Sequence, residues 1–133
     1  MSEYVVDAAA AVNALIGKGA VDIAARRRIF ESTCHAPHLL DVEVGQVLRR
    51  GERTGQLTTE IARTALAALP EMIEYRYPHT GQLAELAWEL RHTISFYDGL
   101  YVALATVLDV PLLTTDVKLS KAPGLTCEVE ALN

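Results

Sequence analysis

The chain has 133 residues, half of them hydrophobic and only 6% aromatic, which predicts a single domain over residues 1–133 with an aliphatic core. No apolar run reaches the ~18 residues of a membrane span. Acidic residues stand where a signal peptide would be basic, so we expect a cytoplasmic protein with no membrane partner. The net charge of −5 argues against bulk coating of nucleic acid but not against a nuclease whose acids bind a metal.

The first seventy residues alternate apolar runs of strand length with helical patterns. The predicted strands cover residues 3–6 and 34–36. The predicted helices cover residues 8–16, 21–31, 39–53 and 58–69. We expect Pro70 to end the last of these helices. We also expect the third and fourth helices to pack together at one edge of the domain.

The second half of the chain continues the same alternation. The predicted strands cover residues 72–77, 110–114 and 125–129. The predicted helices cover residues 80–90, 95–108 and 117–122. Strands that alternate with helices are typical of an α/β fold, here one central parallel sheet of about five strands flanked by helices on both faces.

The cysteines and histidines give no metal-binding signal. Cys34 and Cys127 form neither a CxxC pair nor a zinc spacing, so we interpret both as core thiols in a reducing compartment. His35 and His38 are separated by Pro37, which excludes a shared helical face. We expect capping or surface roles for these two histidines.

Four acidic residues stand at or near the ends of predicted elements. They are Asp7, Glu43, Asp98 and Asp116. Asp7 and Asp116 each follow a predicted strand, and Asp98 and Glu43 lie early in helices. Because the carboxyl ends of parallel strands lie at one edge of a sheet, these acids are expected to approach one another there.

Each of these acids also has a simpler explanation. Ser95 and Asp98 have the spacing of a capping box, and Asp116 could cap the short helix that follows it. Taken singly, a cap is favoured over a catalyst by roughly two to one. If the acids converge, however, carboxylates ~4 Å apart repel by ~4 kcal/mol per pair at an effective dielectric near 20. Their pKa values must then rise, or a cation with a preference for oxygen, Mg²⁺ or Mn²⁺, must join them.

Four motifs, taken in order, resemble those of the PIN-domain ribonucleases, and specifically the VapC-type toxins of bacterial toxin–antitoxin pairs. The motifs are VVDAAA at residues 5–10, PHLLDVEVGQVLRR at 37–50, SFYDGLYVALA at 95–105 and PLLTTDVKL at 111–119. This resemblance implies a Mg²⁺-dependent endoribonuclease (with Mn²⁺ as an alternative ion) that hydrolyses RNA phosphodiesters. It also implies a cognate antitoxin protein, an RNA substrate and a homodimer as the assembly.

The resemblance assigns both metal binding and catalysis to Asp7, Glu43, Asp98 and Asp116. Ser95 and Thr115 are candidates for hydroxyls that support these carboxylates from behind. The family often has a hydroxyl residue shortly after the first acid, where this chain has the run Ala8–Ala10. No acid closely follows Asp116, so a second metal ion is not expected. We expect Asp41 to cap the helix at 39–53.

Two other interpretations stay open. A PIN scaffold of weak or absent activity, used as a protein-interaction module, is favoured by the run Ala8–Ala10 and disfavoured by the four acids. A response-regulator receiver domain is also an acidic α/β protein, but it clusters its acids after the first strand, where Asp7 stands alone. The sequence does not choose among transfer, ribosomal and messenger RNA as the target.

Overall fold

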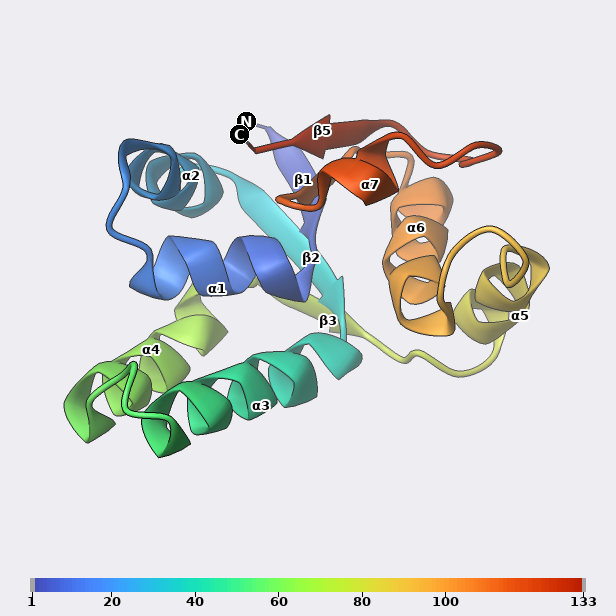
Figure 1. Cartoon of the computed structure of the whole chain (residues 1–133). Helices are drawn as coiled ribbons and strands as arrows, with labels where there is room; N and C mark the ends of the chain where they lie inside the picture. The colour runs from blue at the N-terminus through green and yellow to red at the C-terminus, as the bar shows by residue number, and fades with distance from the viewer. Residues whose placement is uncertain (1, 133) are drawn as a thin grey trace.

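The computed structural model describes residues 2–132 and is built around one sheet (Figure 1). Its strands are β1 (Glu3–Val6), β2 (Thr33–Pro37), β3 (Tyr75–Tyr77), β4 (Leu112–Thr114) and β5 (Val129–Ala131). They lie in the order β3-β2-β1-β4-β5, and every neighbouring pair is parallel. The α/β class and the five-stranded parallel sheet predicted from the sequence are therefore confirmed.

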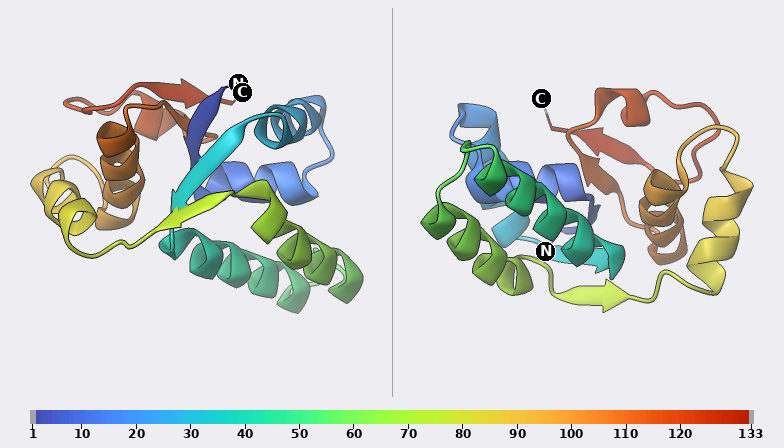
Figure 2. Two further views of the ribbon diagram at one scale, coloured as in Figure 1. Left: turned by 180° about the vertical axis from the view of Figure 1, so that it is seen from behind. Right: turned by 60° about the horizontal axis from the view of Figure 1, so that its bottom comes forward.

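Seven helices in the described residues surround this sheet. They are α1 (Ala8–Ile16), α2 (Ala20–Phe30), α3 (Leu39–Arg53), α4 (Thr59–Met72), α5 (Gln82–Glu89), α6 (Phe96–Leu108) and α7 (Val117–Ser120). The sheet runs between α1–α4 on one side and α5 with α6 on the other, as Figures 1 and 2 show from front and back. Helices α3 and α4 pack together as predicted, and α1 contacts both.

The core follows from the sequence of the central strands and of α6. Val5, Val6, Leu112 and Leu113 have no exposed surface, as expected of neighbouring strands covered on both faces. In α6 the seven successive residues 99–105 are all buried. A helix that is apolar on all sides is buried within a domain. Helix α6 therefore packs against β1, β2 and β4 on one side of the sheet.

Helices α5 and α6 approach closely at a glycine. A Cβ placed on Gly99 would lie 3.1 Å from the Cβ of Ala87 and 3.2 Å from its carbonyl oxygen. Helix α6 ends at Asp109, which has a left-handed φ of 55° that aspartate tolerates better than most residues. This tight packing fixes the start of α6, which carries Asp98.

Several predicted boundaries are wrong. Helix α4 continues through Pro70 to Met72, because a proline in the last turn removes only its own N–H, and the N–H of Ile73 still donates to the Leu69 carbonyl at 3.3 Å. Met72 and Ile73 are buried at this helix end, so the strand predicted over 72–77 shrinks to β3. The last strand begins at Val129 instead of residue 125, because it pairs only with the short β4.

Two predicted residue roles, the cap at Asp41 and a surface or capping role for His35, are wrong, and the core thiol at Cys34 is confirmed. Asp41 does not cap α3; it accepts hydrogen bonds from Arg76 at 2.6 and 3.0 Å and so ties α3 to β3. His35 is buried in the sheet, between the Tyr77 hydroxyl at 2.8 Å and the Glu3 carboxylate at 2.9 Å. Cys34 is a buried free thiol, as expected.

Within residues 2–132, none of the helices has by itself the length and apolar character of a membrane span. Only α1 and α2 taken together reach the required length and apolar character, and a bend of 109° separates them.

Candidate active site

Asp7 is the most buried of the four acids, with a relative exposure of 5%. It follows β1 directly, and the pairing of Val6 with Leu113 sets it beside the end of β4. Its Oδ1 caps α1 by accepting the N–H of Ala10 at 2.9 Å, and its Oδ2 accepts the Thr114 hydroxyl. Burial raises the pKa of Asp7 to about 6, the two hydrogen bonds oppose that rise, and nearby negative charges add to it.

Thr114 connects Asp7 with Asp116. Its hydroxyl donates to the Asp7 carboxylate and accepts the backbone N–H of Asp116 at 3.0 Å. The Oδ1 of Asp116 in turn accepts the N–H groups of Lys118 at 2.9 Å and Leu119 at 3.3 Å, so Asp116 caps α7 as the simpler interpretation predicts. A single buried hydroxyl therefore fixes the spacing between two of the acids.

The sequence predicts supporting hydroxyls at Ser95 and Thr115. Ser95 contacts Asp98, whereas the hydroxyl that contacts Asp7 belongs to Thr114 and not to Thr115. Thr114 is fully buried at the end of β4, and Thr115 is only partly buried. In the observed register Val6 pairs with Leu113, so Asp7 lies opposite Thr114, and the sequence alone does not give this register. Thr114 also supplies the contact to Asp7 that the run Ala8–Ala10 lacks.

Asp98 lies in the first turn of α6. Its N–H donates to the Ser95 hydroxyl at 3.1 Å, so Ser95 caps the helix. Burial and the charge of Asp116 raise the pKa of Asp98, and the Ser95 hydroxyl opposes that rise. The acid is therefore both part of a helix start and a neighbour of another carboxylate.

Glu43 projects from α3 and is held by Tyr101 of α6. The Tyr101 hydroxyl, which is buried, donates to Oε1 of Glu43 at 2.5 Å. Burial raises the pKa of Glu43, the Tyr101 hydrogen bond opposes the rise, and the charge of Asp98 adds to it. Sequence reasoning missed Tyr101, although it lies three residues after Asp98 and therefore on the same helix face.

The four acids share one electrostatic neighbourhood, and Asp98 is its centre. The charge of Asp98 raises the pKa of both Asp7 and Glu43, and the charge of Asp116 raises that of Asp7 and Asp98. Ion pairs within residues 2–132 join Arg28 to Glu130, His35 to Glu3 and Arg76 to Asp41. In this described part of the chain no cation is paired with any of the four acids.

The fit to a metal ion rests on donor chemistry. As the side chains stand in residues 2–132, no three His, Cys, Asp or Glu groups are arranged to hold an ion. The converging donors are nevertheless all carboxylates, which are the ligands that Mg²⁺ and Mn²⁺ prefer, and no basic side chain competes with an ion for them. If the protein binds a hard divalent cation, these four carboxylates are the side chains that would hold it, and they would have to turn toward the ion.

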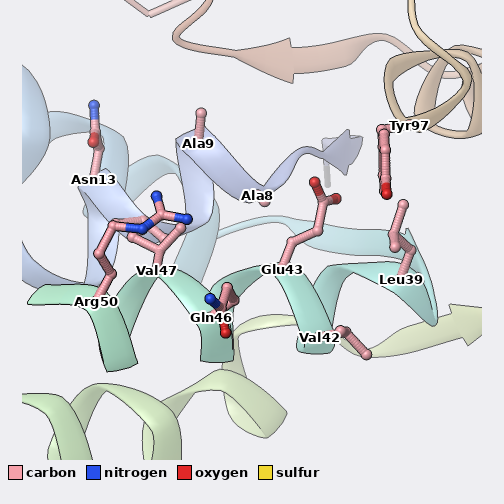
Figure 3. A pocket seen from close by; sticks show the side chains of 11 residues that line it. Ala8, Ala9, Asn13, Leu39, Val42, Glu43, Gln46, Val47, Arg50 and Tyr97 are labelled. Atoms are coloured by element: carbon pink, nitrogen blue, oxygen red, sulfur yellow. The ribbon is translucent and has the colours of Figure 1, made fainter. Parts of the chain in front are cut away.

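A pocket of about 610 Å³ opens beside Glu43, between α1 and α3 (Figure 3). It is lined by Ala8, Ala9, Val12, Asn13, Leu39, Val42, Glu43, Gln46, Val47, Arg50 and Tyr97. Figure 3 shows the Glu43 carboxylate and the Arg50 guanidinium rising from α3 toward α1, with Tyr97 at the Glu43 end. The acidic site therefore continues into a partly apolar pocket.

Comparisons with known proteins agree over nearly the whole chain. Residues 4–125 match the PIN domain family. The chain is 58% identical over 130 residues to Ribonuclease VapC1 of Mycobacterium tuberculosis, covering 98% of each protein. It is 39% identical over 125 residues to the VapC ribonuclease Mb0985 of Mycobacterium bovis, covering 94% of each.

Two solved structures share the fold at low sequence identity. VapBC2 from Rickettsia felis, crystallised with a DNA fragment of its promoter, aligns with a TM-score of 0.72 at 14% identity, covering 98% of this chain and 99% of that chain. PAE2754 from Pyrobaculum aerophilum aligns with a TM-score of 0.69 at 21% identity, covering 96% of this chain and 90% of that chain.

Proposed function

Because the chain belongs to the PIN-domain family and, within it, to the VapC ribonucleases, we propose that it is a Mg²⁺-dependent endoribonuclease and the toxin of a toxin–antitoxin pair. The observation that carries the proposal is the shared electrostatics of Asp7, Glu43, Asp98 and Asp116. Three of these acids have raised pKa values, and neighbouring carboxylates contribute to each rise.

Each acid has a role in this proposal. Asp7, Asp98 and Asp116 would hold Mg²⁺ directly or through water, and Glu43 would bind the ion or orient the attacking water. A bound Mg²⁺ ion would supply charge that stabilises the phosphate oxygens and acidifies a water. Mn²⁺ suits the same donors.

Two neutral side chains would position these acids. Thr114 bridges Asp7 and Asp116, so their separation would change little when RNA binds. Tyr101 holds one oxygen of Glu43 and would leave the other for water or metal. The Thr114 contact also weakens the alternative of an inactive interaction scaffold, since it replaces the hydroxyl that is missing from Ala8–Ala10.

The test is cleavage of RNA by the purified protein with Mg²⁺, with EDTA, and by Asp7→Asn with Mg²⁺. We expect the last two rates to fall by at least about 100-fold, because removing one transition-state charge interaction costs roughly 3 kcal/mol. Glu71→Gln on the exposed side of α4 makes the same charge change away from the site and should keep the full rate. Equal cleavage in every sample would refute the mechanism.

The proposed assembly is a homodimer that binds a cognate antitoxin protein. The R. felis structure similar to this chain is of VapBC2, and α3 and α4 of this chain expose apolar side chains. On α4, Ile61 is 40% exposed and Leu66 51% exposed, and an antitoxin or a second copy of the chain would cover this apolar surface. Co-expression with a short neighbouring open reading frame and measurement of the mass in solution would test both partners.

A further inference from the structure

We propose that the pocket between α1 and α3 is a nucleobase subsite, which binds the base of the nucleotide next to the scissile phosphate. This inference rests on the proposed ribonuclease function and adds the residues that would select the nucleotide. It assigns stacking to Tyr97, a base-edge hydrogen bond to Gln46, and contacts with the following nucleotides to Asn13 and Arg50, which lie at the other end of the pocket (Figure 3). All four line the pocket.

The position of the pocket is the first argument. Glu43 belongs both to the acid cluster and to the pocket wall, so an RNA strand with a phosphate at the acids passes this opening. Glu43 and Arg50 are seven residues apart on one helix, or about 10 Å along its axis. That length corresponds to roughly three stacked nucleotides at ~3.4 Å each, and to fewer when the strand is extended.

The lining is the second argument. A base presents two apolar faces and a polar edge. Proteins that bind single strands stack aromatic rings on the faces and form hydrogen bonds to the edge. Here the walls contributed by Ala8, Ala9 and Val12 are apolar, and Asn13 and Gln46 carry amides. Tyr97 is 60% exposed at the end of the pocket, so its ring is accessible to a stacking base. The pocket volume of about 610 Å³ lies within the range of roughly 300–1,000 Å³ that is typical of small-ligand sites, which is enough for a nucleoside.

Charge is the third argument, and it favours RNA over an apolar protein segment. Arg50 is exposed, it is the one Lys or Arg among the described lining residues, and within residues 2–132 it forms no ion pair. An unpaired guanidinium close to the acidic site can bind one phosphate of the RNA backbone while another phosphate lies at the acids. In a chain of net charge −5 this local cation would help to hold the strand.

Geometry adds a requirement on the substrate. A base inside the pocket cannot stack on its neighbours or pair with another strand. The nucleotide beside the cut must therefore be unpaired when it binds, and a duplex that covers this position should be a poor substrate.

The first experiment compares Arg50→Ala with Arg49→Ala, a neighbouring exposed arginine that does not line the pocket. Cleavage of a single-stranded RNA oligonucleotide is measured at several salt concentrations. For Arg50→Ala we expect a five- to tenfold rise in KM with kcat within about twofold, and a salt slope lower by about one. Arg49→Ala should match the unmodified protein. Binding to Asp7→Asn, with and without Arg50→Ala, measures the same loss without cleavage.

The second experiment compares Gln46→Ala and Asn13→Ala with Gln56→Ala, an exposed residue outside the pocket. Each protein cleaves an RNA pool randomised around one site, and the products are sequenced. We expect each pocket variant to change the nucleotide preference at one position near the cut by roughly tenfold or more, and the control to leave every position unchanged.

The outcomes separate this inference from the function on which it rests. If the protein cleaves RNA with Mg²⁺ and the three pocket variants behave like their controls, the subsite is refuted and the ribonuclease function stands. If the pocket variants lose only antitoxin binding, the pocket is a protein site and the inference is equally refuted. If no RNA is cleaved or bound by the unmodified protein, both proposals fail. Thermal melts within a few degrees of the unmodified protein confirm that the variants are folded.

Discussion

Asp7 is a carboxyl group whose surroundings oppose its own ionisation. Desolvation dominates, and the charges of Asp98 and Asp116 act in the same direction. The hydrogen bonds from Ala10 and Thr114 stabilise the carboxylate but do not offset burial. In the absence of a cation, this residue therefore costs the folded protein stability at neutral pH.

The first prediction is a dependence of stability on pH that Asp7→Asn reduces. The folded pKa of about 6 exceeds the ordinary value of 3.8, so the folded state binds the proton more tightly than the unfolded state. Between about pH 4 and 6 the free energy of unfolding should fall by up to about 3 kcal/mol and then level off. The variant should keep only the smaller contributions of Glu43 and Asp98. Urea unfolding in EDTA at four pH values measures this, and parallel curves for both proteins would contradict it.

The second prediction concerns the hydroxyl that holds Glu43. Tyr101→Phe removes a hydrogen bond to a charged group and keeps the ring in the core. Such bonds contribute about 1.5–3 kcal/mol, so we expect kcat to fall by roughly tenfold or more, with KM for RNA within about twofold. Tyr75→Phe removes an exposed phenol outside the site and serves as the control. A change confined to KM would mean that Tyr101 acts on binding rather than on Glu43.

At the residue scale the sequence singled out four acids and Ser95, which contacts Asp98, but not Thr114 or Tyr101, which contact Asp7 and Glu43. Asp7, Asp98 and Asp116 could be selected because each stands at an element end, which is a local property. The contacts of Thr114 and Tyr101 join residues 107 and 58 positions apart. Helical spacing puts Tyr101 on the same face as Asp98, but the acid that each hydroxyl contacts is decided only when the sheet and α6 pack together.

At the element scale, Arg76 of β3 joins the end of α4 to the start of α3. Its guanidinium donates to the carbonyls of Ile73 at 2.9 Å and Leu69 at 3.3 Å, and to both carboxylate oxygens of Asp41. It therefore satisfies the last carbonyls of α4 and joins them to α3 while it lies in β3.

The third prediction follows from this arrangement. Arg76→Met keeps the length of the side chain but loses the paired hydrogen bonds to Asp41 and the contacts to α4. We expect the free energy of unfolding to fall by about 1–2 kcal/mol, at the lower end for charged bonds because Asp41 is partly exposed. Arg63→Met on the exposed side of α4 is the matched control. Urea unfolding at neutral pH measures both, and equal midpoints would show that the Arg76 contacts contribute nothing.

Helices could be predicted better than short strands in this chain. The patterns of α1, α3 and α6 repeat over nine or more residues, and a local pattern of that length is informative. The segment around Met72 has strand-like composition, yet Met72 and Ile73 fill the core from a helix end. Burial of that kind depends on neighbours distant in sequence, so composition alone misplaced the boundary.

At the scale of the whole molecule, the order of the strands assembles the site. The chain moves outward from β1 through β2 to β3, and then returns to add β4 and β5 on the other side of β1. The direction of winding therefore reverses between β1 and β4, which is where open α/β sheets bind their ligands. Asp7 and Asp116 follow those two strands, so topology alone brings together acids more than one hundred residues apart.

The fourth prediction is that a divalent cation stabilises the whole fold through this junction. A ligand at ~100 times its Kd raises the free energy of unfolding by about 2.7 kcal/mol, which for a chain of this length raises Tm by roughly 10 °C. Screening by salt would also relieve repulsion among the acids, so the comparison is Mg²⁺ or Mn²⁺ against K⁺ at equal ionic strength. Asp7→Asn should lose most of the shift, and Glu71→Gln should keep it. If K⁺ produced the same shift, or if Asp7→Asn retained it, the acids would repel one another without binding an ion. The proposed metal-dependent mechanism would then be refuted.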